Sequence, residues 1–338
     1  MKYYKPFLAF GIALGLLGAQ KVNKTGTTAA GFLKIGAGAR AVGMGGAFVS
    51  IADDASAMYW NPSGITQLKS DELLVNHSQW IADIAFTYFG FVQTLPRIGT
   101  LGIQVTAMTM GDMDVTRYGY EEGTGETFRA GSYALGFTYA RNLTDRFSIG
   151  GTAKYINEFI SRSSASGLAI DLGTLFLTPF KDVRFGVSIS NFGQKLQMTG
   201  KDLLVNKDID PLHNGNNESV NAYLATDRFD LPLLLRVGLS GEVVDSKALR
   251  LTWAVDGIHP NDNSEYANVG LELGLLNDLV SLRGGLKSLF QQDGEEQFTL
   301  GGGLKVPVNR SMLMEADYAF ESFVHLNNIH KLAIRIVF

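Results

Sequence analysis

Hydrophobic and polar residues alternate with a period of two along most of the chain beyond residue 70. In segment 248–256, for example, Leu249, Leu251, Trp253 and Val255 alternate with residues that are polar or small. Successive side chains of a β-strand point to opposite faces, so this pattern predicts strands with one apolar and one polar face. We expect about fourteen such strands, at residues 72–78, 84–95, 99–109, 131–141, 146–158, 166–177, 183–191, 232–243, 248–258, 265–276, 279–289, 296–306, 311–321 and 329–338.

The connections between these strands differ in length. Short turns are expected at residues 96–98, 142–145, 178–182, 244–247, 277–278 and 307–310, and longer loops at residues 110–130, 159–165, 192–231 and 259–264. A β-sandwich shows the same alternation of side chains, but short turns on one rim and long loops on the other are typical of outer-membrane barrels. The pattern favours an all-β antiparallel transmembrane β-barrel, with the longest loop as a partly ordered lid at the external rim.

Residues 1–19 have the features of a secretory signal peptide. Lys2 and Lys5 precede an apolar run at residues 7–17, and two small residues follow it. This run is too short to cross a bilayer, and no later stretch has about 18 consecutive apolar residues. The chain has no Cys and a net charge of −4, which becomes −6 without the two lysines. Neither disulfides nor binding to nucleic acid is therefore expected.

Residues 20–70 form a separate unit ahead of the expected barrel, which occupies residues 71–338. Glycines interrupt residues 30–68 so often that neither a strand nor one long helix is expected there. Short helical turns are expected at residues 39–44 and 54–60, the second of them ending before Pro62. A compact segment of small residues such as this one needs walls around it to be stable.

The run GFLKIGAGARAVGMGGAFVSIADDASAMYWNPSGI, at residues 31–65, resembles the N-terminal hatch of PorV/PorQ-type proteins, a group of FadL-like outer-membrane β-barrels. Asn61-Pro62-Ser63-Gly64 matches the Asn-Pro-Ala-Gly pattern of that family except for Ser at the third position. The resemblance implies a barrel of about fourteen strands in the outer membrane of a Gram-negative-type bacterium. It also implies that the N-terminal hatch plugs the lumen of the barrel.

If the apolar faces of the strands meet lipid, the opposite faces line the lumen. These faces carry charges of both signs, at Lys154, Asp171, Arg184, Arg236, Glu242, Arg250, Asp256, Glu272, Arg283, Lys287, Lys305, Glu315, Asp317, Lys331 and Arg335. They also carry many glycines, at positions 102, 136, 150, 173, 186, 238, 274, 285, 301 and 303. Glycine within a strand often marks a close approach by another backbone, so these walls suit a packed hatch. In the early strands, Phe89 and Phe91 are expected to point inward.

Five hatch residues are candidates for plugging the lumen. Arg40 is flanked by small apolar residues, and we expect it to form an ion pair with the wall, because an unpaired buried charge is costly. Asp53 and Asp54 either pair within the lumen or face solvent at the periplasmic mouth. Asn61 and Pro62 are expected to form a turn and cap where the hatch meets the first strand.

The last expected strand has Leu332, Ile334, Ile336 and the terminal Phe338 on one face. A final amphipathic strand that ends in Phe resembles the signal read by the barrel-insertion machinery of outer membranes. The alternative is an ordinary C-terminal strand.

No motif predicts catalysis, a cofactor or a bound metal. Gly36-Ala-Gly38 lacks the βαβ context of a dinucleotide fingerprint, and the five histidines lack ligand spacing. The run 256–265 has oxygen ligands for calcium but no EF-hand spacing, so a solvated loop is the preferred interpretation. There is no Gly-x-Ser-x-Gly elbow. The chain is therefore not expected to be an enzyme.

Two functional hypotheses remain. The first is a PorV-like accessory or cargo-shuttle component of type IX protein secretion, with secreted proteins or translocon subunits as partners besides the outer-membrane lipid. The second is a FadL-like transporter of hydrophobic small molecules. The hatch sequence and the charged, glycine-lined lumen favour the first.

Overall fold

The computed structural model describes residues 24–180, 183–210, 212, 219–246, 248–291 and 294–338. The expected signal peptide, residues 1–19, lies outside this part of the chain. Within it, no helix combines the length and apolarity needed to cross a membrane.

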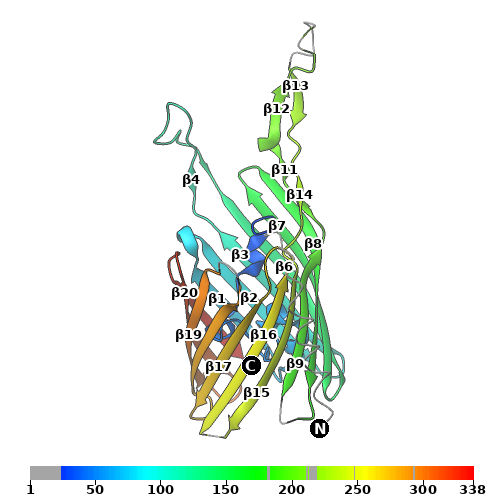
Figure 1. Cartoon of the computed structure of the whole chain (residues 1–338), viewed down its shortest axis with the longest axis vertical. Helices are drawn as coiled ribbons and strands as arrows, with labels where there is room; N and C mark the ends of the chain where they lie inside the picture. Colours follow the sequence, from blue (N-terminus) through cyan, green and yellow to red (C-terminus); the bar gives the residue numbers. More distant parts are fainter. Residues whose placement is uncertain (1–23, 181–182, 211, 213–218, 247, 292–293) are drawn as a thin grey trace, which may run out of the picture.

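Fourteen antiparallel strands of the described chain close into a barrel (Figure 1). Each strand pairs with its neighbours in the sequence, β1 pairs with β21, and β9 pairs with β15 across the longest loop. Closure leaves the barrel without free edges. The strands are β1 (Glu72–Gln79), β2 (Ala85–Leu95), β3 (Gly99–Thr109), β6 (Ala130–Thr144), β7 (Phe147–Ile160), β8 (Ser163–Leu177), β9 (Arg184–Gly193), β15 (Leu234–Asp245), β16 (Leu249–Pro260), β17 (Tyr266–Leu275), β18 (Val280–Leu289), β19 (Glu296–Pro307), β20 (Leu313–Phe323) and β21 (Ile329–Val337). The predicted fold class is confirmed.

The two faces of the wall differ as the alternation predicts. Large apolar side chains are exposed on the outer face, among them Leu135, Phe137, Leu168, Ile170, Leu172, Leu271, Leu282, Leu300, Leu332 and Ile334. Nine of the fifteen charged residues expected in the lumen are buried: Lys154, Asp171, Arg236, Asp256, Glu272, Arg283, Glu315, Asp317 and Lys331. The other six are partly buried.

The expectation for Phe89 and Phe91 was wrong. Phe86 and Tyr88 are the fully buried aromatic residues of β2, whereas Phe89 is 37% exposed. Phe91 lies on the same face as Phe89 and stacks against the terminal Phe338 at a ring-centroid distance of 6.5 Å. The inward aromatic side chains of β2 pack against the hatch, which is why apolar residues occupy both faces of this strand.

One expected loop is replaced by strand. Strands β7 and β8 extend to Ile160 and from Ser163, so residues 161–162 alone join them where a loop over 159–165 was predicted. The serine-rich start of β8 resembles a loop in composition, but its backbone pairs fully with β7. The two strands therefore extend the wall on the side of the long loops.

Two long connections form arms that project from the rim (Figure 1). The first arm, residues 110–129, contains the short strands β4 (Met113–Asp114) and β5 (Thr127–Phe128), which pair with each other. The second arm is the connection between β9 and β15. Between β9 and β15 the chain forms β10 (Leu196–Gln197), β11 (Thr199–Gly200), η4 (Lys201–Leu203), β12 (Leu204–Lys207), β13 (Val220–Tyr223) and β14 (Arg228–Phe229). Strand β10 pairs with β14, β12 with β13, and β11 with β8. The second segment thus stands up from the rim instead of folding over it as a lid.

The C-terminal strand gives a prediction about insertion into the membrane. Phe338 is 49% exposed on the outer face, so replacing it with Asp disturbs little inside the barrel. If Phe338 ends an insertion signal, Phe338→Asp lowers the amount of protein in the outer membrane about tenfold, measured by immunoblot of membrane fractions. Leu304→Asp, a change at another outward-facing position, controls for a charge placed on this face. Equal amounts for the Phe338 variant and the wild type would mean that β21 is only a strand.

Candidate functional site

The N-terminal hatch lies inside the barrel as four short helical segments: η1 (Gly31–Lys34), α2 (Ala39–Gly43), α3 (Ala57–Trp60) and η2 (Pro62–Gln67). At its start, Lys34 pairs with Asp262 in the β16–β17 loop, with Nζ 2.7 Å from Oδ2. At its end, η2 packs against β6, β7 and β8, and residues 68–71 then lead into β1. The hatch therefore runs along the lumen from the long-loop end to the short-turn end.

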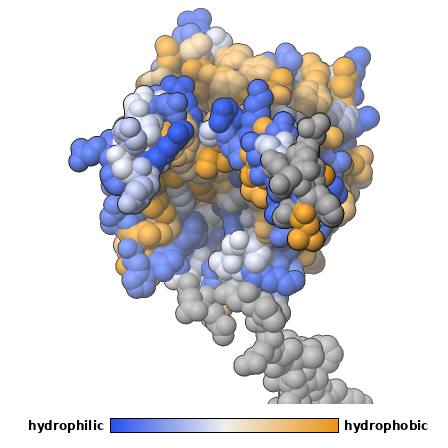
Figure 2. All heavy atoms as spheres, turned by 90° about the horizontal axis from the view of Figure 1, so that it is seen from above, coloured by the Kyte–Doolittle hydropathy of each residue, from blue (hydrophilic) through white to orange (hydrophobic). Residues whose placement is uncertain are grey.

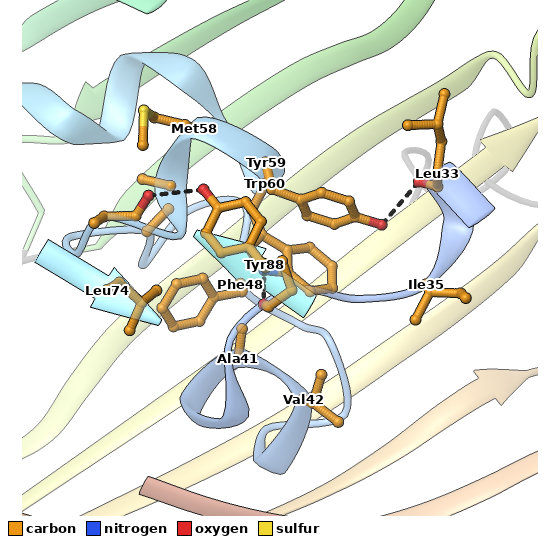
Figure 3. Packing of buried hydrophobic residues seen from close by; sticks show 14 of the residues in the cluster. Leu33, Ile35, Ala41, Val42, Phe48, Met58, Tyr59, Trp60, Leu74 and Tyr88 are labelled. Atoms are coloured by element: carbon orange, nitrogen blue, oxygen red, sulfur yellow. Dashed lines mark hydrogen bonds between the residues drawn. The ribbon is translucent and has the colours of Figure 1, made fainter. Parts of the chain in front are cut away.

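Aromatic residues form the apolar centre of the hatch (Figure 3). Trp60 packs edge-to-face against Phe48 and Tyr59, at ring-centroid distances of 6.3 and 5.1 Å. Their polar atoms bind backbone: Trp60 Nε1 donates to the Ala37 carbonyl (2.8 Å) and the Tyr59 hydroxyl to the Leu33 carbonyl (3.0 Å). Burial raises the pKa of Tyr59 to about 12, so this hydroxyl remains a donor at neutral pH. These contacts tie separate turns of a glycine-rich segment into one unit.

Arg40 joins the hatch to the wall through a two-point ion pair. Its Nε lies 2.9 Å from Glu272 Oε2 on β17, and its second terminal nitrogen lies 3.1 Å from Oε1 of the same carboxylate. Its first terminal nitrogen donates to Asp53 (2.5 Å) and, at 3.4 Å, to Asp54. A guanidinium paired in this way with a carboxylate is held in both distance and orientation. Arg40 thus links two hatch carboxylates to the barrel.

Glu272 is in turn part of a network of alternating charges on the wall. Arg250 and Arg283 each bind it, at 2.9 and 2.7 Å. Arg283 continues to Asp317 (2.5 Å) and Glu315 (3.4 Å) on β20. Burying charges without partners would be costly, so the network and the hatch depend on one another.

Asp53 and Asp54 have different roles. Burial by itself would raise the pKa of Asp53, but Arg40 and Arg184 outweigh it and hold that pKa below the ordinary value of 3.8. A carboxyl with a lower pKa in the folded state stabilises that state above its ordinary pKa and loses the effect as the pH falls through the lower value. The Arg40–Asp53 contact therefore persists at neutral and mildly acidic pH. Asp54 accepts from the amide and hydroxyl of Ser56, at 2.8 and 2.5 Å, ahead of α3.

Asn61 and Pro62 fix the end of the hatch. Asn61 Oδ1 accepts from the Ser63 amide (3.2 Å) and caps η2, in which Pro62 takes the first position. The Asn61 amide nitrogen donates to the carbonyls of Val49 (2.9 Å) and of Thr174 on β8 (3.0 Å). The Ser63 hydroxyl adds a 2.7 Å bond to Asn61, which Ala would not make. The motif thus joins two parts of the hatch and the wall.

Several wall glycines are needed because hatch backbone lies directly against them. A Cβ atom at Gly150 would lie 2.6 Å from the Ser63 amide nitrogen, and one at Gly186 would lie 2.6 Å from the Val49 carbonyl oxygen. At Gly285 it would lie 2.2 Å from the Gly45 amide nitrogen, so these positions have no room for a side chain. At three other glycines predicted to line the lumen, an added Cβ atom would contact side chains of the wall and not the hatch. These are Gly136, Gly274 and Gly303.

Some contacts that hold the hatch against the wall were not predicted from the sequence. Asp256 Oδ2 accepts from the amides of Phe48 (2.8 Å) and Val49 (3.0 Å), and Lys331 Nζ donates to the Gly36 carbonyl (3.0 Å). Gly270 lies against the hatch as well, because a Cβ atom added to it would lie 2.3 Å from the Met44 carbonyl oxygen. Alternation placed Asp256 and Lys331 in the lumen, but no sequence signal indicates which backbone groups they bind. Among the described residues, no group of three or more His, Cys, Asp or Glu side chains could hold a metal ion.

Comparison with known protein sequences gives two findings. The family model described as "Type IX secretion system protein PorV" matches residues 18–199 of this chain. No curated protein sequence matches.

The fold is similar to several solved barrels. The CymD monoaromatic hydrocarbon channel has 12% identity and a TM-score of 0.57, covering 89% of this chain and 96% of that one. The Ralstonia pickettii toluene transporter TbuX has 13% identity and a TM-score of 0.54, covering 90% and 98%. A Pseudomonas aeruginosa FadL homologue has 11% identity and a TM-score of 0.52, covering 87% and 96%. At these identities the likeness concerns the fold.

Proposed function

This chain belongs to the PorV family of outer-membrane barrels, and from this we propose that it acts in type IX secretion as a plugged barrel that binds secreted proteins at its external face. In this role it is a binding protein, not an enzyme. Its partners are secreted cargo or translocon subunits. The observation that carries the proposal is that the hatch fills the lumen while exposed apolar groups gather on the arms.

The seating of the hatch supports a role that leaves the lumen closed. Arg40 and Asn61 bind the wall at two levels, and wall glycines lie against hatch backbone between and beside them. Moving the hatch would separate buried ion pairs from their partners, which typically costs about 3–5 kcal/mol for each pair broken. A protein that binds its partner outside the lumen has no need to break these contacts.

The arms supply surfaces suited to protein partners. Tyr118 and Tyr120, in the first arm, are fully exposed and 65% exposed, respectively. The second arm exposes Leu212, Tyr223 and Leu224. The two arms that carry these side chains project beyond the rim of the barrel (Figure 1). Exposed apolar groups of this kind mark interaction sites, and aromatic residues often dominate the binding energy.

A double substitution on the second arm tests the proposal. Tyr223→Ser with Leu224→Ser should lower recovery of secreted cargo or translocon subunits at least about tenfold, because both exposed apolar contacts are lost. The readout is quantitative mass spectrometry of proteins that co-purify from native outer membranes. Lys207→Ser with Asn221→Ser, which changes exposed polar residues of the same arm, is the matched control. Unchanged recovery with the first pair would contradict a binding role for this arm.

Transport of hydrophobic small molecules is the second candidate, and the similarity of the fold to a monoaromatic hydrocarbon channel and a toluene transporter supports it. The charged lumen argues against it, because an apolar solute would pass buried groups such as Glu272 and Arg283. Uptake of radiolabelled toluene by cells with and without the protein distinguishes the two candidates. The secretion role predicts equal uptake.

A further inference from the structure

A cavity of about 320 Å³ lies at the long-loop end of the lumen, between the hatch and strands β15 to β18. Lys34 and Trp60 line it from the hatch, Arg236 and Tyr266 from the wall, and Asp262 from the β16–β17 loop. Figure 2 shows this end of the molecule, where the surface is hollowed between the arms. A ligand could therefore reach the cavity from outside without displacing the hatch.

The guanidinium of Arg236 makes no ion-pair contact with a carboxylate of the described chain, although the Asp256 carboxylate lies near enough for the two charges to attract. Its side chain is buried, and one of its nitrogens donates to Ser190 Oγ at 2.9 Å. Its guanidinium carbon lies 5.4 Å from the Trp60 ring centroid and 5.7 Å from that of Tyr59. Among the described residues no carboxylate forms an ion pair with it. The faces of aromatic rings attract the positive charge of the guanidinium but leave its remaining N–H donors unused. A buried arginine with unused donors is suited to bind an anion.

The other cations that line the cavity already have partners. Lys34 pairs with Asp262 at 2.7 Å, and Lys287 pairs with Glu296 at 2.8 Å and also with Glu321. Arg236 therefore differs from them in having donors available for a ligand.

Asp262 presents the opposite feature, a buried acceptor. Its Oδ2 accepts from Thr28 Oγ1 (2.9 Å) and from Lys34 Nζ (2.7 Å). Its Oδ1 is buried and has no hydrogen-bond partner among the described residues, although the residue is only 1% exposed. Buried polar atoms are nearly always hydrogen-bonded, so an orphaned oxygen beside a cavity points to a donor supplied by a ligand.

We propose that this cavity binds a small zwitterion, with a carboxylate at Arg236 and an ammonium group at Asp262 Oδ1. Liquid water occupies about 30 Å³ per molecule, so the cavity has room for about ten non-hydrogen atoms, roughly the size of a dipeptide. The Trp60 ring supplies an apolar surface for the middle of the ligand. This site goes beyond the proposed role in secretion and does not depend on it.

Calorimetric titration of the purified full chain in detergent tests the site. The probes are alanyl-alanine, its N-acetylated form and its C-terminal amide. The free dipeptide should bind saturably to the wild type, and each capped form should bind at least about tenfold more weakly, since each loses one charge-assisted contact. These three titrations need no substitution. Equal binding of capped and free forms, or no saturable binding of the free dipeptide, would overturn the proposal.

Two variants assign the ends of the ligand. Arg236→Gln should abolish the preference for a free carboxylate, so that alanyl-alanine and its amide bind equally weakly. Asp262→Asn should abolish the preference for a free amine. Arg162→Gln, which removes an exposed charge paired with Asp202, should keep both preferences. Heat-modifiable migration on a gel verifies that each variant is folded. A folded Arg236 variant that still prefers the free carboxylate would contradict the assignment.

Discussion

A barrel that lacks residues 24–68 should conduct ions steadily in a planar lipid bilayer, whereas the intact protein should stay nearly silent. About eight strands close around an interior that wall side chains just fill, and about 16–18 leave an aqueous channel. Fourteen strands leave space that the hatch now occupies. Without the hatch, the charged wall around Glu272 and Arg283 would be hydrated, and water and ions would pass. The current through single inserted molecules is the measurement.

A substitution that keeps the hatch in the chain complements the deletion. Arg40→Met removes the two-point pair with Glu272 and the contacts with Asp53 and Asp54, so intermittent conductance is expected while Asn61 still holds the far end. Arg117→Met, on the first arm, removes an exposed ion pair and serves as the control. A silent deletion variant that migrates as a folded barrel would mean that something other than the hatch closes the lumen.

Gly285→Val should open or destabilise the barrel, whereas Gly284→Val, one residue away, should have little effect. A Cβ at Gly285 would lie 2.2 Å from the Gly45 amide nitrogen and 2.4 Å from the Met44 carbonyl carbon, so the hatch must move. A Cβ at Gly284 points the other way, and its nearest neighbours are 4.0 Å distant. Overpacking a well-filled interior typically costs about 1–3 kcal/mol, and here the clash is with backbone, which adapts poorly.

The readouts for this pair are bilayer conductance and the temperature at which gel migration shifts from the folded to the unfolded position. Gly285→Val should lower that temperature by several degrees and produce current, and Gly284→Val should match the wild type. Both residues lie in β18 and have the same effect on strand propensity. Equal behaviour of the two variants would contradict direct packing of the hatch against this strand.

Much of the fold follows from local pattern. The alternation of side chains located all fourteen strands to within a few residues, because lipid on one side and the filled lumen on the other impose a period of two. It failed where both faces of a strand are apolar: in β2, Phe86 and Tyr88 face the hatch while Phe89 faces outward. The start of β8 was missed because Ser163 and its neighbours resemble a loop in composition, and only pairing with β7 reveals them as strand.

The contacts of the hatch were predictable in kind but not in detail. Arg40 was expected to pair with the wall and Glu272 to face the lumen, yet their meeting depends on contacts between residues separated by more than 200 positions. Wall glycines were recognised as places of close approach, but Gly270 was omitted. No sequence signal shows that Asp256 binds two hatch amides, because backbone donors are the same at every residue.

The central claim, that the hatch is a fixed part of the barrel interior, is tested most directly by hydrogen exchange of the intact wild-type protein, read by mass spectrometry. Amide protons exchange slowly where they are buried and hydrogen-bonded, and fast where segments open locally. Peptides covering residues 36–65 should exchange as slowly as those from β16 to β18, and far more slowly than those from the arms at residues 113–128 and 204–223. Exchange in the hatch as fast as in the arms would contradict the account.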